Sequence, residues 1–345
     1  MGVITQGKWC RFCLVAAVTI AVSSLFGLAL SGKPARVSGV IAPGVNDTWS
    51  GAVFVTGDVF VPQGVTLTIQ PGTTVTFADR KDDKNLWKGQ LLDQQKFRGV
   101  PRAELLVAGT LIARGTSNKL ITFTGDWSSK DANLPYGQWG GIVILPTATP
   151  TTLEYLAIMF AEVGITIDNK SAIENSYIIG SWGSLCDQPP VKNPPNHWDV
   201  RVGVFVRGSG GSAVRKNVIL WNTWGIHANT GGTGKPPIAI TGNWICWNST
   251  KTKGFDVPNG IHVYATEAVI TDNWISYNDW GIEVSRSIVT VTNNWFTFND
   301  LGFVWYFDND EAICKPSKLS GNTALCQRGD YVQVGGESPL PQWWF

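Results

Sequence analysis

The chain has 345 residues and a formal net charge of +1, and 15% of its residues are charged, which is below the roughly 25% usual for soluble domains. A balance this close to neutral gives no electrostatic case for nucleic acid or an anionic membrane surface as a partner. The 38 Gly and 17 Trp residues, together with abundant Val, Ile, Thr and Asn, favour strands and turns over helices.

The N-terminal segment, residues 1–31, has the features of an export signal. Lys8 and Arg11 form a basic region, and an uncharged, largely apolar run follows from residue 12 to residue 30. The small-x-small motif Ala-Leu-Ser at 29–31 predicts a cleaved signal peptide, bacterial-type export and a secreted or cell-envelope location. The run is also long enough to span a bilayer, so an uncleaved membrane anchor is the alternative. A short linker is predicted for residues 32–47.

Short strands separated by tight turns are predicted from residue 48 onward. The stretch VFVPQGVTLTIQPGTTVTF at 59–77 holds three alternating runs between Pro-Gln-Gly and Pro-Gly-Thr turns, and such alternation is typical of half-buried strands. The same pattern continues at 103–126, 138–145 and 153–167. Longer loops are predicted at 78–102, 184–200 and 249–259.

The C-terminal half of the chain contains a repeat. Four segments align, at residues 213–229, 239–265, 268–284 and 289–305. Each has Asn at two positions five residues apart, which are Asn217 and Asn222, Asn243 and Asn248, Asn273 and Asn278, and Asn294 and Asn299. Successive first Asn residues are separated by 26, 30 and 21 positions (217 to 243, 243 to 273, 273 to 294). An irregular period of this kind is typical of a solenoid whose turns absorb insertions.

Alternation along each repeat assigns side chains to the inside or the outside of a tube. The residue two places after the first Asn is apolar and is predicted to stack inside, at Ile219, Ile245, Ile275 and Phe296. The residue after the Gly forms a second inward stack, at Ile226, Ile261, Ile282 and Phe303. The two Asn positions are predicted to form structural ladders at turns, with side-chain amides bonded along the stack.

These residues carry a resemblance to the right-handed parallel β-helix superfamily, the pectate-lyase-like secreted bacterial proteins with parallel β-helix repeats. Its motifs are Val-Pro-x-Gly-x-Thr-Leu-Thr-Ile-x-Pro-Gly-Thr at 61–73, Gly109-Thr110-Leu111, Trp139-Gly140-Gly141-Ile142 and the Asn ladders. The resemblance implies an all-β, single-stranded right-handed parallel β-helix over residues 48–305, with about ten to twelve coils at about 4.8 Å per coil. It implies no single activity, since the superfamily includes polysaccharide lyases, hydrolases, adhesins and structural proteins.

The repeat stops after Trp305, and residues 306–345 are predicted to cap the open end of the solenoid. Cys314 and Cys326 are predicted to form a disulfide in this cap, because an exported protein folds in an oxidising compartment. The spacing leaves open whether Cys186 pairs with Cys246.

The outward positions bring the candidate catalytic residues together. His227, His262 and Glu283 each follow an inward Ile on successive coils, and side chains about 4.8 Å apart can share a proton. One interpretation makes a histidine the general base and Glu283 its orienting partner or the general acid. A second makes the three residues ligands of a divalent metal. The structural alternative is a solvated polar strip on an outer face.

The candidate substrate-binding residues lie in neighbouring columns. Arg207, Asn229 and Tyr264 belong to the next outward column, and Trp244, Trp274 and Trp295 each follow a first Asn and are predicted to point outward. Exposed aromatic residues on a secreted protein are typical of a binding surface, and the C–H faces of sugar rings stack on indole. The alternative is that these rings pack under loops or stiffen the solenoid. A further column, whose direction is not predicted, contains Trp221, Trp247, Tyr277 and Phe298.

The sequence predicts no certain cofactor. The acidic run at residues 308–311, Asp-Asn-Asp-Glu, offers oxygen ligands for Ca²⁺ but lacks the spacing of a known calcium loop, so a solvated turn is the alternative.

Two functional hypotheses follow. The first is a secreted protein that binds, or binds and cleaves, an extended polysaccharide or cell-surface glycan along one face bearing both the aromatic and the His/Glu residues. The second is a non-catalytic structural or adhesive protein of the cell envelope. Enzyme status stays open between a polysaccharide lyase, a glycoside hydrolase and no enzyme, because the sequence lacks the Asp cluster and Gly-His-Gly of polygalacturonases. The oligomeric state is not predicted.

Overall fold

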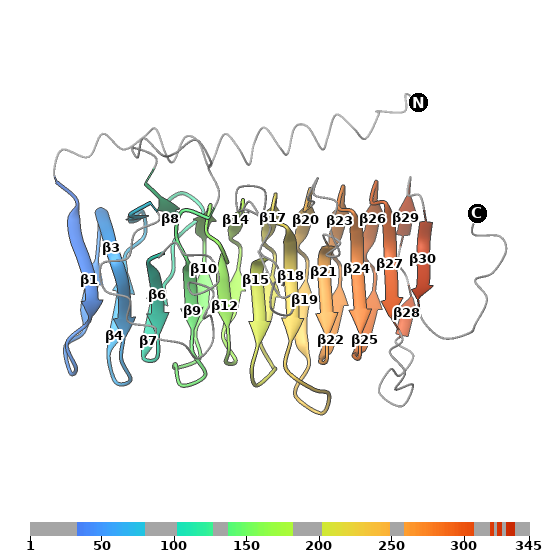
Figure 1. Ribbon diagram of the computed structural model, residues 1–345, viewed down its shortest axis with the longest axis horizontal. Coiled ribbons are helices and arrows are strands. Elements are labelled where there is room, and N and C mark those ends of the chain that lie inside the picture. The colour runs from blue at the N-terminus through green and yellow to red at the C-terminus, as the bar shows by residue number, and fades with distance from the viewer. Residues whose placement is uncertain are drawn as a thin grey trace, which may run out of the picture.

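The computed structural model describes residues 33–79, 102–126, 137–181, 202–248, 259–306, 318–320, 323–325 and 329–334. Every helix or strand assigned to these residues is a strand, and the strands pair in parallel as a right-handed β-helix. Figure 1 shows them side by side along one axis, from β1 (Ala35–Val40) at one end to β30 (Gly329–Val334) at the other. The predicted all-β fold is confirmed.

Three faces enclose the tube, and we number them in the order in which the chain crosses them in each coil. Face 1 contains β2 (Asp47–Trp49), β4 (Thr66–Ile69), β7 (Thr110–Ala113), β10 (Thr152–Glu154), β13 (Ala172–Glu174), β16 (Ala213–Arg215), β19 (Ile238–Thr241), β22 (Glu267–Thr271), β25 (Ile288–Thr292) and β28 (Lys318–Ser320). Face 2 contains β5 (Thr74–Phe77), β8 (Ile121–Gly125), β11 (Leu156–Met159), β14 (Tyr177–Ile179), β17 (Val218–Leu220), β20 (Trp244–Cys246), β23 (Trp274–Ser276), β26 (Trp295–Thr297) and β29 (Thr323–Leu325). Face 3 contains β6 (Glu104–Val107), β9 (Gly141–Ile144), β12 (Ile165–Ile167), β15 (Val202–Arg207), β18 (Trp224–Asn229), β21 (Asn259–Tyr264), β24 (Trp280–Ser285), β27 (Leu301–Tyr306) and β30. β1 and β3 (Ala52–Val61) run along both face 2 and face 3.

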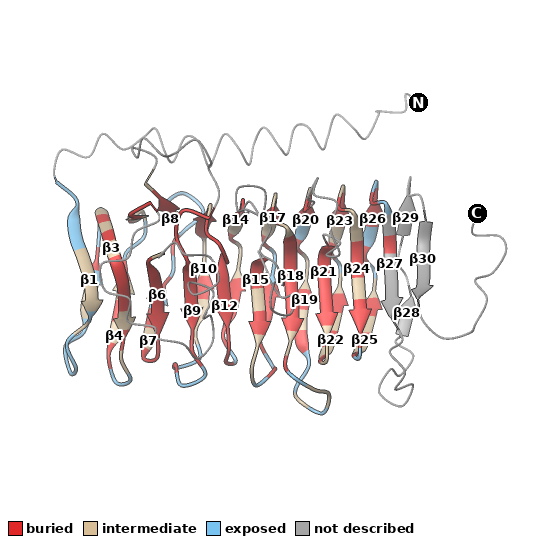
Figure 2. Cartoon of the chain, in the orientation of Figure 1, coloured by how far each residue is buried: buried red, intermediate tan, exposed pale blue. Residues whose placement is uncertain are grey.

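The core of the tube consists of apolar side chains stacked coil on coil. Ile219 pairs with Ile245, Ile245 with Ile275, and Ile275 with Phe296, and all four side chains are buried. The second predicted stack is also in register, from Ile226 through Ile261 and Ile282 to Phe303. Figure 2 shows this burial continuing along the axis. The register follows from the strict alternation of these strands, because a slip of one residue would turn every apolar side chain outward.

Each of the four aligned repeats turns twice through a single left-handed residue followed by Asn. Trp221, Trp247, Tyr277 and Phe298 precede the second Asn of their repeats with φ angles of 53°, 53°, 56° and 56°. Lys216, Gly242, Asp272 and Asn293 precede the first Asn with φ angles of 54°, 67°, 57° and 57°. A lone residue in this conformation bends the chain sharply from one face to the next, and its strain is held by the surrounding packing.

The Asn side chains form two continuous ladders inside these turns. In the first, the backbone N–H of Asn217 donates to Oδ1 of Asn243 at 3.0 Å, and that of Asn243 donates to Oδ1 of Asn273 at 2.9 Å. The Nδ2 groups of the same residues donate to the same oxygens at 3.1 and 2.9 Å. The second ladder repeats this pattern from Asn222 onward. The ladders therefore satisfy buried backbone donors that a bend would otherwise leave unpaired.

The Gly at the second position of β18 and β21 on face 3 lies too close to the next coil for a side chain. A Cβ on Gly225 would lie 2.5 Å from the carbonyl oxygen of Gly260, and a Cβ on Gly260 would lie 2.7 Å from that of Gly281. Because the obstacle is backbone, no rotamer change would relieve it, which explains why Gly recurs at this position.

Two predicted boundaries differ from the structure. Residues 35–40, within the predicted linker at 32–47, form β1, which pairs in parallel with β3. Within the predicted cap at 306–345, β28, β29 and β30 pair with the three strands of the preceding coil. The sequence signal was present there, because Gly321-Asn322 precedes Thr323 as Asn293-Asn294 precedes Trp295.

Several predictions fall on residues outside the described part of the chain. They are the signal peptide or anchor at 1–31, the disulfide between Cys314 and Cys326, the acidic run at 308–311, and the partner that Cys186 would provide for Cys246. No helix long and apolar enough to cross a membrane occurs among the residues that the structure describes.

Candidate functional site

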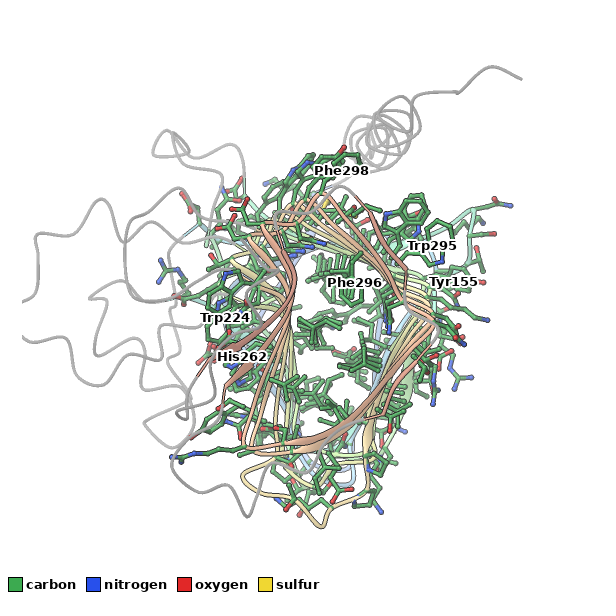
Figure 3. The ribbon with its side chains drawn as sticks, turned by 90° about the vertical axis from the view of Figure 1, so that its right-hand side faces the viewer. Tyr155, Trp224, His262, Trp295, Phe296 and Phe298 are labelled. Carbon is green, nitrogen blue, oxygen red and sulfur yellow. The ribbon has the colours of Figure 1, made fainter. Side chains whose placement is uncertain are left out.

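The predicted catalytic residues lie on three adjacent strands of face 3. His227 on β18 pairs with His262 on β21, and His262 pairs with Glu283 on β24. Phe205 on β15 precedes them in the same column. Their backbone neighbours Ile226 and Ile261 are buried in the core, so both imidazoles lie on the outer side of the sheet, as Figure 3 shows for His262. The alignment predicted from the sequence is therefore present.

Both histidines are buried although they point away from the core. The exposed fractions of His227 and His262 are 1% and 5%. The indole of Trp224 stacks on the His227 ring at a centroid distance of 5.0 Å and meets the His262 ring edge-on at 4.7 Å. Phe205 meets His227 edge-on from the coil before, at 4.8 Å. The solvated polar strip considered as an alternative therefore does not describe this column.

His262 contacts its two neighbours, His227 and Glu283, through opposite edges of its ring. Nδ1 of His262 lies 3.2 Å from Nδ1 of His227, whereas Nε2 of His262 lies 3.8 Å from Oε1 of Glu283. The three residues consequently do not direct their donor atoms at one point, as a shared metal ion requires. Among the residues that the structure describes, no group of three or more His, Cys, Asp or Glu side chains is arranged to hold a metal.

Burial keeps both rings uncharged near neutral pH. The pKa of His227 is well below its ordinary value because of burial and, secondarily, the neighbouring His262. Burial also lowers the pKa of His262 from 6.5 to about 3. A neutral imidazole carries one N–H donor and one lone-pair acceptor, so the hydrogen bond between the two Nδ1 atoms needs the proton on one ring only.

Sequence reasoning missed Asn259, which fixes Glu283 in place. It lies at the start of β21, and its Nδ2 donates a hydrogen bond to Oε2 of Glu283. Asn259 is fully buried. The sequence did carry a signal, since Asn259 takes the place before Gly that Trp224 and Trp280 occupy in the neighbouring repeats.

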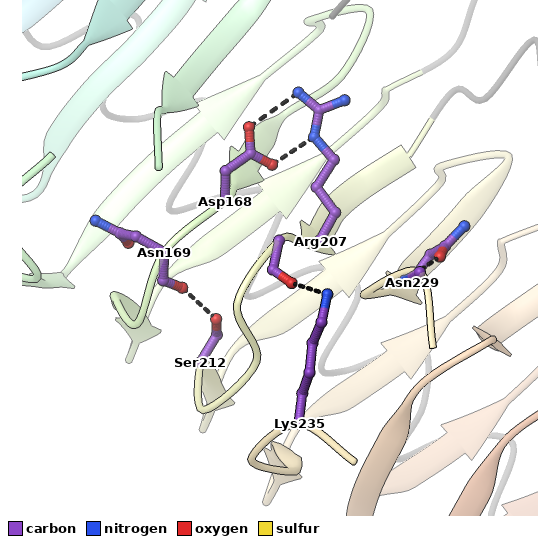
Figure 4. A network of polar contacts seen from close by, with 8 residues as sticks. Asp168, Asn169, Arg207, Ser212, Asn229 and Lys235 are labelled. Carbon is purple, nitrogen blue, oxygen red and sulfur yellow. Dashed lines mark hydrogen bonds and ion pairs between the residues drawn. The ribbon is translucent and has the colours of Figure 1, made fainter. Parts of the chain in front are cut away.

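The next outward column holds a half-buried Arg207 in an ion pair with a buried carboxylate. Its guanidinium donates through Nε to Oδ1 of Asp168 and through Nη2 to Oδ2 at 2.9 Å, as Figure 4 shows. Asp168, which sequence reasoning also missed, is 2% exposed, and burial raises the pKa of its carboxyl although Arg207 acts in the opposite direction. The guanidinium also lies over the ring of Phe205 at 5.4 Å. Arg207 is therefore engaged within the protein.

The other two residues of this column have local partners. Oδ1 of Asn229 accepts a hydrogen bond from the backbone of Gly231 at 3.0 Å. The hydroxyl of Tyr264 accepts one from Nη1 of Arg286 at 3.1 Å. Both side chains are half-buried at the edge of face 3.

The three predicted tryptophans form a row on face 2. Trp244 pairs with Trp274, and Trp274 with Trp295, on β20, β23 and β26. Their ring centroids are 5.9 and 5.6 Å apart, and the planes of Trp274 and Trp295 differ by 20°. Trp244 is 39% exposed and Trp295 is 42% exposed. These indoles point outward, as predicted.

The aromatic row and the histidine column therefore lie on different faces, which corrects the single face expected for both. Figure 3 shows Trp295 on one side of the tube and His262 with Trp224 on another. The physical reason is the left-handed residue before each second Asn, such as Trp247, which turns the chain from face 2 to face 3 between the two sets.

The second aromatic column stacks along this turn. Trp247 lies on Tyr277 at 5.2 Å with a plane angle of 13°, and Tyr277 lies on Phe298 at 4.8 Å with 15°. Between the two aromatic columns runs a buried outward column that includes Cys246 and Ser276, whose Sγ and Oγ are 3.0 Å apart.

Comparisons with known proteins return structural similarity only. No protein-family model and no curated protein sequence matches the chain. Among solved structures, it is similar to the enzymatically active domain of tailspike protein 2 of bacteriophage CBA120, with 14% identity, a TM-score of 0.41, and coverage of 85% of this chain and 42% of that one. The full-length tailspike protein 2 from an Escherichia coli O157:H7 bacteriophage gives 14% identity, a TM-score of 0.39 and coverage of 85% and 38%.

A third similar structure is the A-module of a mannuronan C-5 epimerase from Azotobacter vinelandii, with 12% identity, a TM-score of 0.37 and coverage of 91% of this chain and 92% of that one. The chain spans about two fifths of the length of the two tailspike chains. The parallel register of every third strand, rather than these similarities, identifies the chain as a right-handed parallel β-helix protein.

Proposed function

We propose that the protein binds an extended polysaccharide along the outer side of face 2, on the row formed by Trp244, Trp274 and Trp295. The observation that carries the proposal is the exposure of Trp244 and Trp295, at 39% and 42%, on three adjacent in-register strands. Large apolar side chains are rarely left exposed together in a monomeric protein, and such patches mark interaction surfaces.

The chemistry of this row suits a carbohydrate. Indole offers an apolar ring and one N–H donor, so it can contact the C–H faces of a sugar while donating to a hydroxyl. The row runs along the tube axis, because its members lie on neighbouring parallel strands about 4.8 Å apart. A linear glycan aligned with the axis would meet one ring on each coil. Secretion or envelope location, predicted from residues 1–31, would bring the protein to such a ligand.

Cleavage of the glycan is not part of this proposal. The candidate catalytic residues His227 and His262 lie on face 3 and are 1% and 5% exposed, and the row lies on face 2. A ligand bound along the row would not contact either imidazole.

A structural or adhesive role is the second candidate, and the close stack of Trp247, Tyr277 and Phe298 favours it. These rings stack on one another at centroid distances of 5.2 and 4.8 Å, which stiffens the turn between face 2 and face 3. In an adhesive protein the exposed edge of the tryptophan row would contact a second copy of the chain. Sedimentation velocity over a range of concentrations distinguishes this role, since self-association would depend on the row without any glycan.

The proposed function is tested by affinity electrophoresis of the purified chain in gels containing neutral or acidic polysaccharides. The parent protein should be retarded by at least one polysaccharide, and the double variant Trp244→Ala/Trp295→Ala should lose this retardation. At about 1 kcal/mol for each ring, the affinity should fall at least tenfold. Ile112→Ala is the matched control, since Ile112 is a 41% exposed apolar residue on face 1. Equal retardation of the parent and the double variant, or no retardation of the parent, would reject the proposal.

A further inference from the structure

Face 2, which bears the tryptophan row, has no charged side chain in its strands. The strands that belong to this face alone, from β5 to β29, contain no Asp, Glu, Lys, Arg or His residue. The second aromatic column, which follows these strands at the turn to face 3, is uncharged as well. Every outward position on these described strands is therefore apolar, aromatic, hydroxyl-bearing, a cysteine or glycine.

The other two faces show that the β-helix fold does not impose this composition. On face 1, Nη1 of Arg215 donates a hydrogen bond to Oε1 of Glu174 at 2.8 Å. On face 3, Arg207 forms its ion pair with Asp168. Charged residues are ordinarily found at positions that contact water. Their absence from face 2 is thus a property of that surface rather than of the architecture.

The uncharged surface is accessible where its aromatic side chains are largest. Trp244, Trp295 and Phe298 are 39%, 42% and 37% exposed, and Figure 3 shows the last two on the outside of the tube. A carboxylate pressed against these rings would lose water and find no cation on the described strands of this face. Burying a charge without a counter-ion is unfavourable, whereas a neutral sugar meets no such penalty.

The turns that border the row are predominantly acidic. Asp272 lies two residues before Trp274, at the turn from face 1, and Asp300 lies two residues after Phe298, at the turn to face 3. Both are exposed. Asp279 holds the place of Asp300 one repeat earlier. Two residues of chain span at most about 7 Å, which is within the Debye length of about 8 Å at physiological ionic strength.

One cation stands at the same border among the described residues of these turns. Lys216 occupies the place of Asp272 two coils earlier, at the end of the row where Val218 replaces a Trp. The three carboxylates therefore outnumber it, and a uronic acid on the row would meet net negative charge. A sugar hydroxyl can donate a hydrogen bond to these carboxylates, and an ionised uronate group cannot.

We propose that the tryptophan row selects an uncharged glycan, a polymer of neutral hexoses or pentoses, and excludes polysaccharides built from uronic acids. The inference rests on the proposed function, because it concerns the ligand of the same row. The indole rings contact the C–H faces of the sugar, and the indole N–H groups and bordering carboxylates meet its hydroxyls. Specificity of this kind comes from repelling the charged competitor as much as from attracting the neutral ligand.

The test is affinity electrophoresis of the full chain in gels containing polysaccharides in matched pairs, with one backbone in a neutral and a carboxylated form. The pairs are hydroxyethyl cellulose with carboxymethyl cellulose, and fully methyl-esterified polygalacturonan with its de-esterified form. In at least one pair the neutral member should retard the chain at a concentration at least about tenfold lower than the carboxylated member. The Trp244→Ala/Trp295→Ala variant should lose this retardation.

The outcomes separate the inference from the proposed function. Retardation that depends on the row but is equal or stronger with the carboxylated member would overturn the inference and leave the proposed function standing. Retardation by no member of any pair, or retardation that persists in the double variant, would reject both.

The variant Asp272→Asn/Asp300→Asn tests the role of the acidic border. At 10 mM salt, where the Debye length is about 30 Å, its retardation by the carboxylated member should rise by about threefold or more, and the gain should shrink at 150 mM. Its retardation by the neutral member should stay within about threefold of the parent. Glu154→Gln/Glu174→Gln on face 1 removes the same charge and should behave like the parent. No gain in the first variant, or an equal gain in this control, would overturn the role of the border.

Discussion

The imidazoles of His227 and His262 lie edge to face on adjacent coils, with ring centroids 4.7 Å apart and Nδ1 atoms 3.2 Å apart. Two neutral imidazoles this close share one hydrogen, and protonating either ring would place a charge in a buried site. The pair therefore couples the stability of the β-helix to pH.

Acid should destabilise the fold between pH 6.5 and pH 3. The folded-state pKa of His262 is about 3 against 6.5 in the unfolded chain, so below pH 6.5 the unfolded state binds the proton and the folded state does not. The stabilisation is complete above pH 6.5 and is lost as the pH falls toward 3. Between pH 7 and pH 4.5 this histidine alone should cost about 3 kcal/mol. Urea midpoints across this range should shift much less in His227→Gln/His262→Gln, and equal shifts would contradict the assignment.

Asn243→Ala should destabilise the protein by about 3 kcal/mol or more. The substitution removes the oxygen that accepts from both the backbone N–H and Nδ2 of Asn217, and the amide that donates to Val214 and Asn273. Several buried groups are then left unpaired, at about 1–3 kcal/mol each. Chemical denaturation measures the loss. Asn229→Ala, which loses one local bond near the surface, should change stability by less than about 1 kcal/mol; comparable losses would show that the ladder is not the cause.

Arg207→Met should be more harmful than the double variant Asp168→Asn/Arg207→Met. The single substitution leaves the 2% exposed Asp168 without its counter-ion, and breaking one side of a buried ion pair costs about 3–5 kcal/mol. The double variant removes both charges and should recover much of that loss in a double-mutant cycle of urea unfolding. Additive losses would mean that the two side chains are not coupled. Retardation by polysaccharide should be unchanged, because Arg207 lies away from the tryptophan row.

Phe298 tests whether strain or packing dominates at the aromatic turn. Its φ is 56° and it is 37% exposed. Asn tolerates this conformation and a β-branched residue does not, so Phe298→Val should be less stable than Phe298→Asn by about 1–2 kcal/mol. Thermal unfolding of the two variants gives the difference. The reverse order would show that apolar contact at this position outweighs the backbone conformation.

Much of the fold could be predicted because the repeat carries its own register. Ile245 and Asn243 recur with the same spacing in each segment, so alternation alone placed one in the core and the other in a ladder. The alignment of His227 with His262 followed from the same register, since each comes directly after an inward Ile.

The relation between faces could not be predicted, because it depends on one backbone angle. Trp247 and Tyr277 adopt a left-handed conformation that bulky side chains seldom take. The residue type at these positions therefore does not predict the turn. The burial of His227 was missed for a related reason: alternation distinguishes inward from outward, not covered from exposed. Asn259 and Asp168 were missed because each acts through a partner that is distant in sequence.

The ladder steps from Asn243 to Asn273 and from Asn273 to Asn294 use the same donors and the same acceptor, although the intervening chain differs in length. Each of these coils thus offers the next coil the same hydrogen-bonding groups. Residues 268–288 can accordingly be regarded as a module that duplication would insert without disturbing its neighbours. The length of the tube can therefore change by whole coils while its cross-section stays the same.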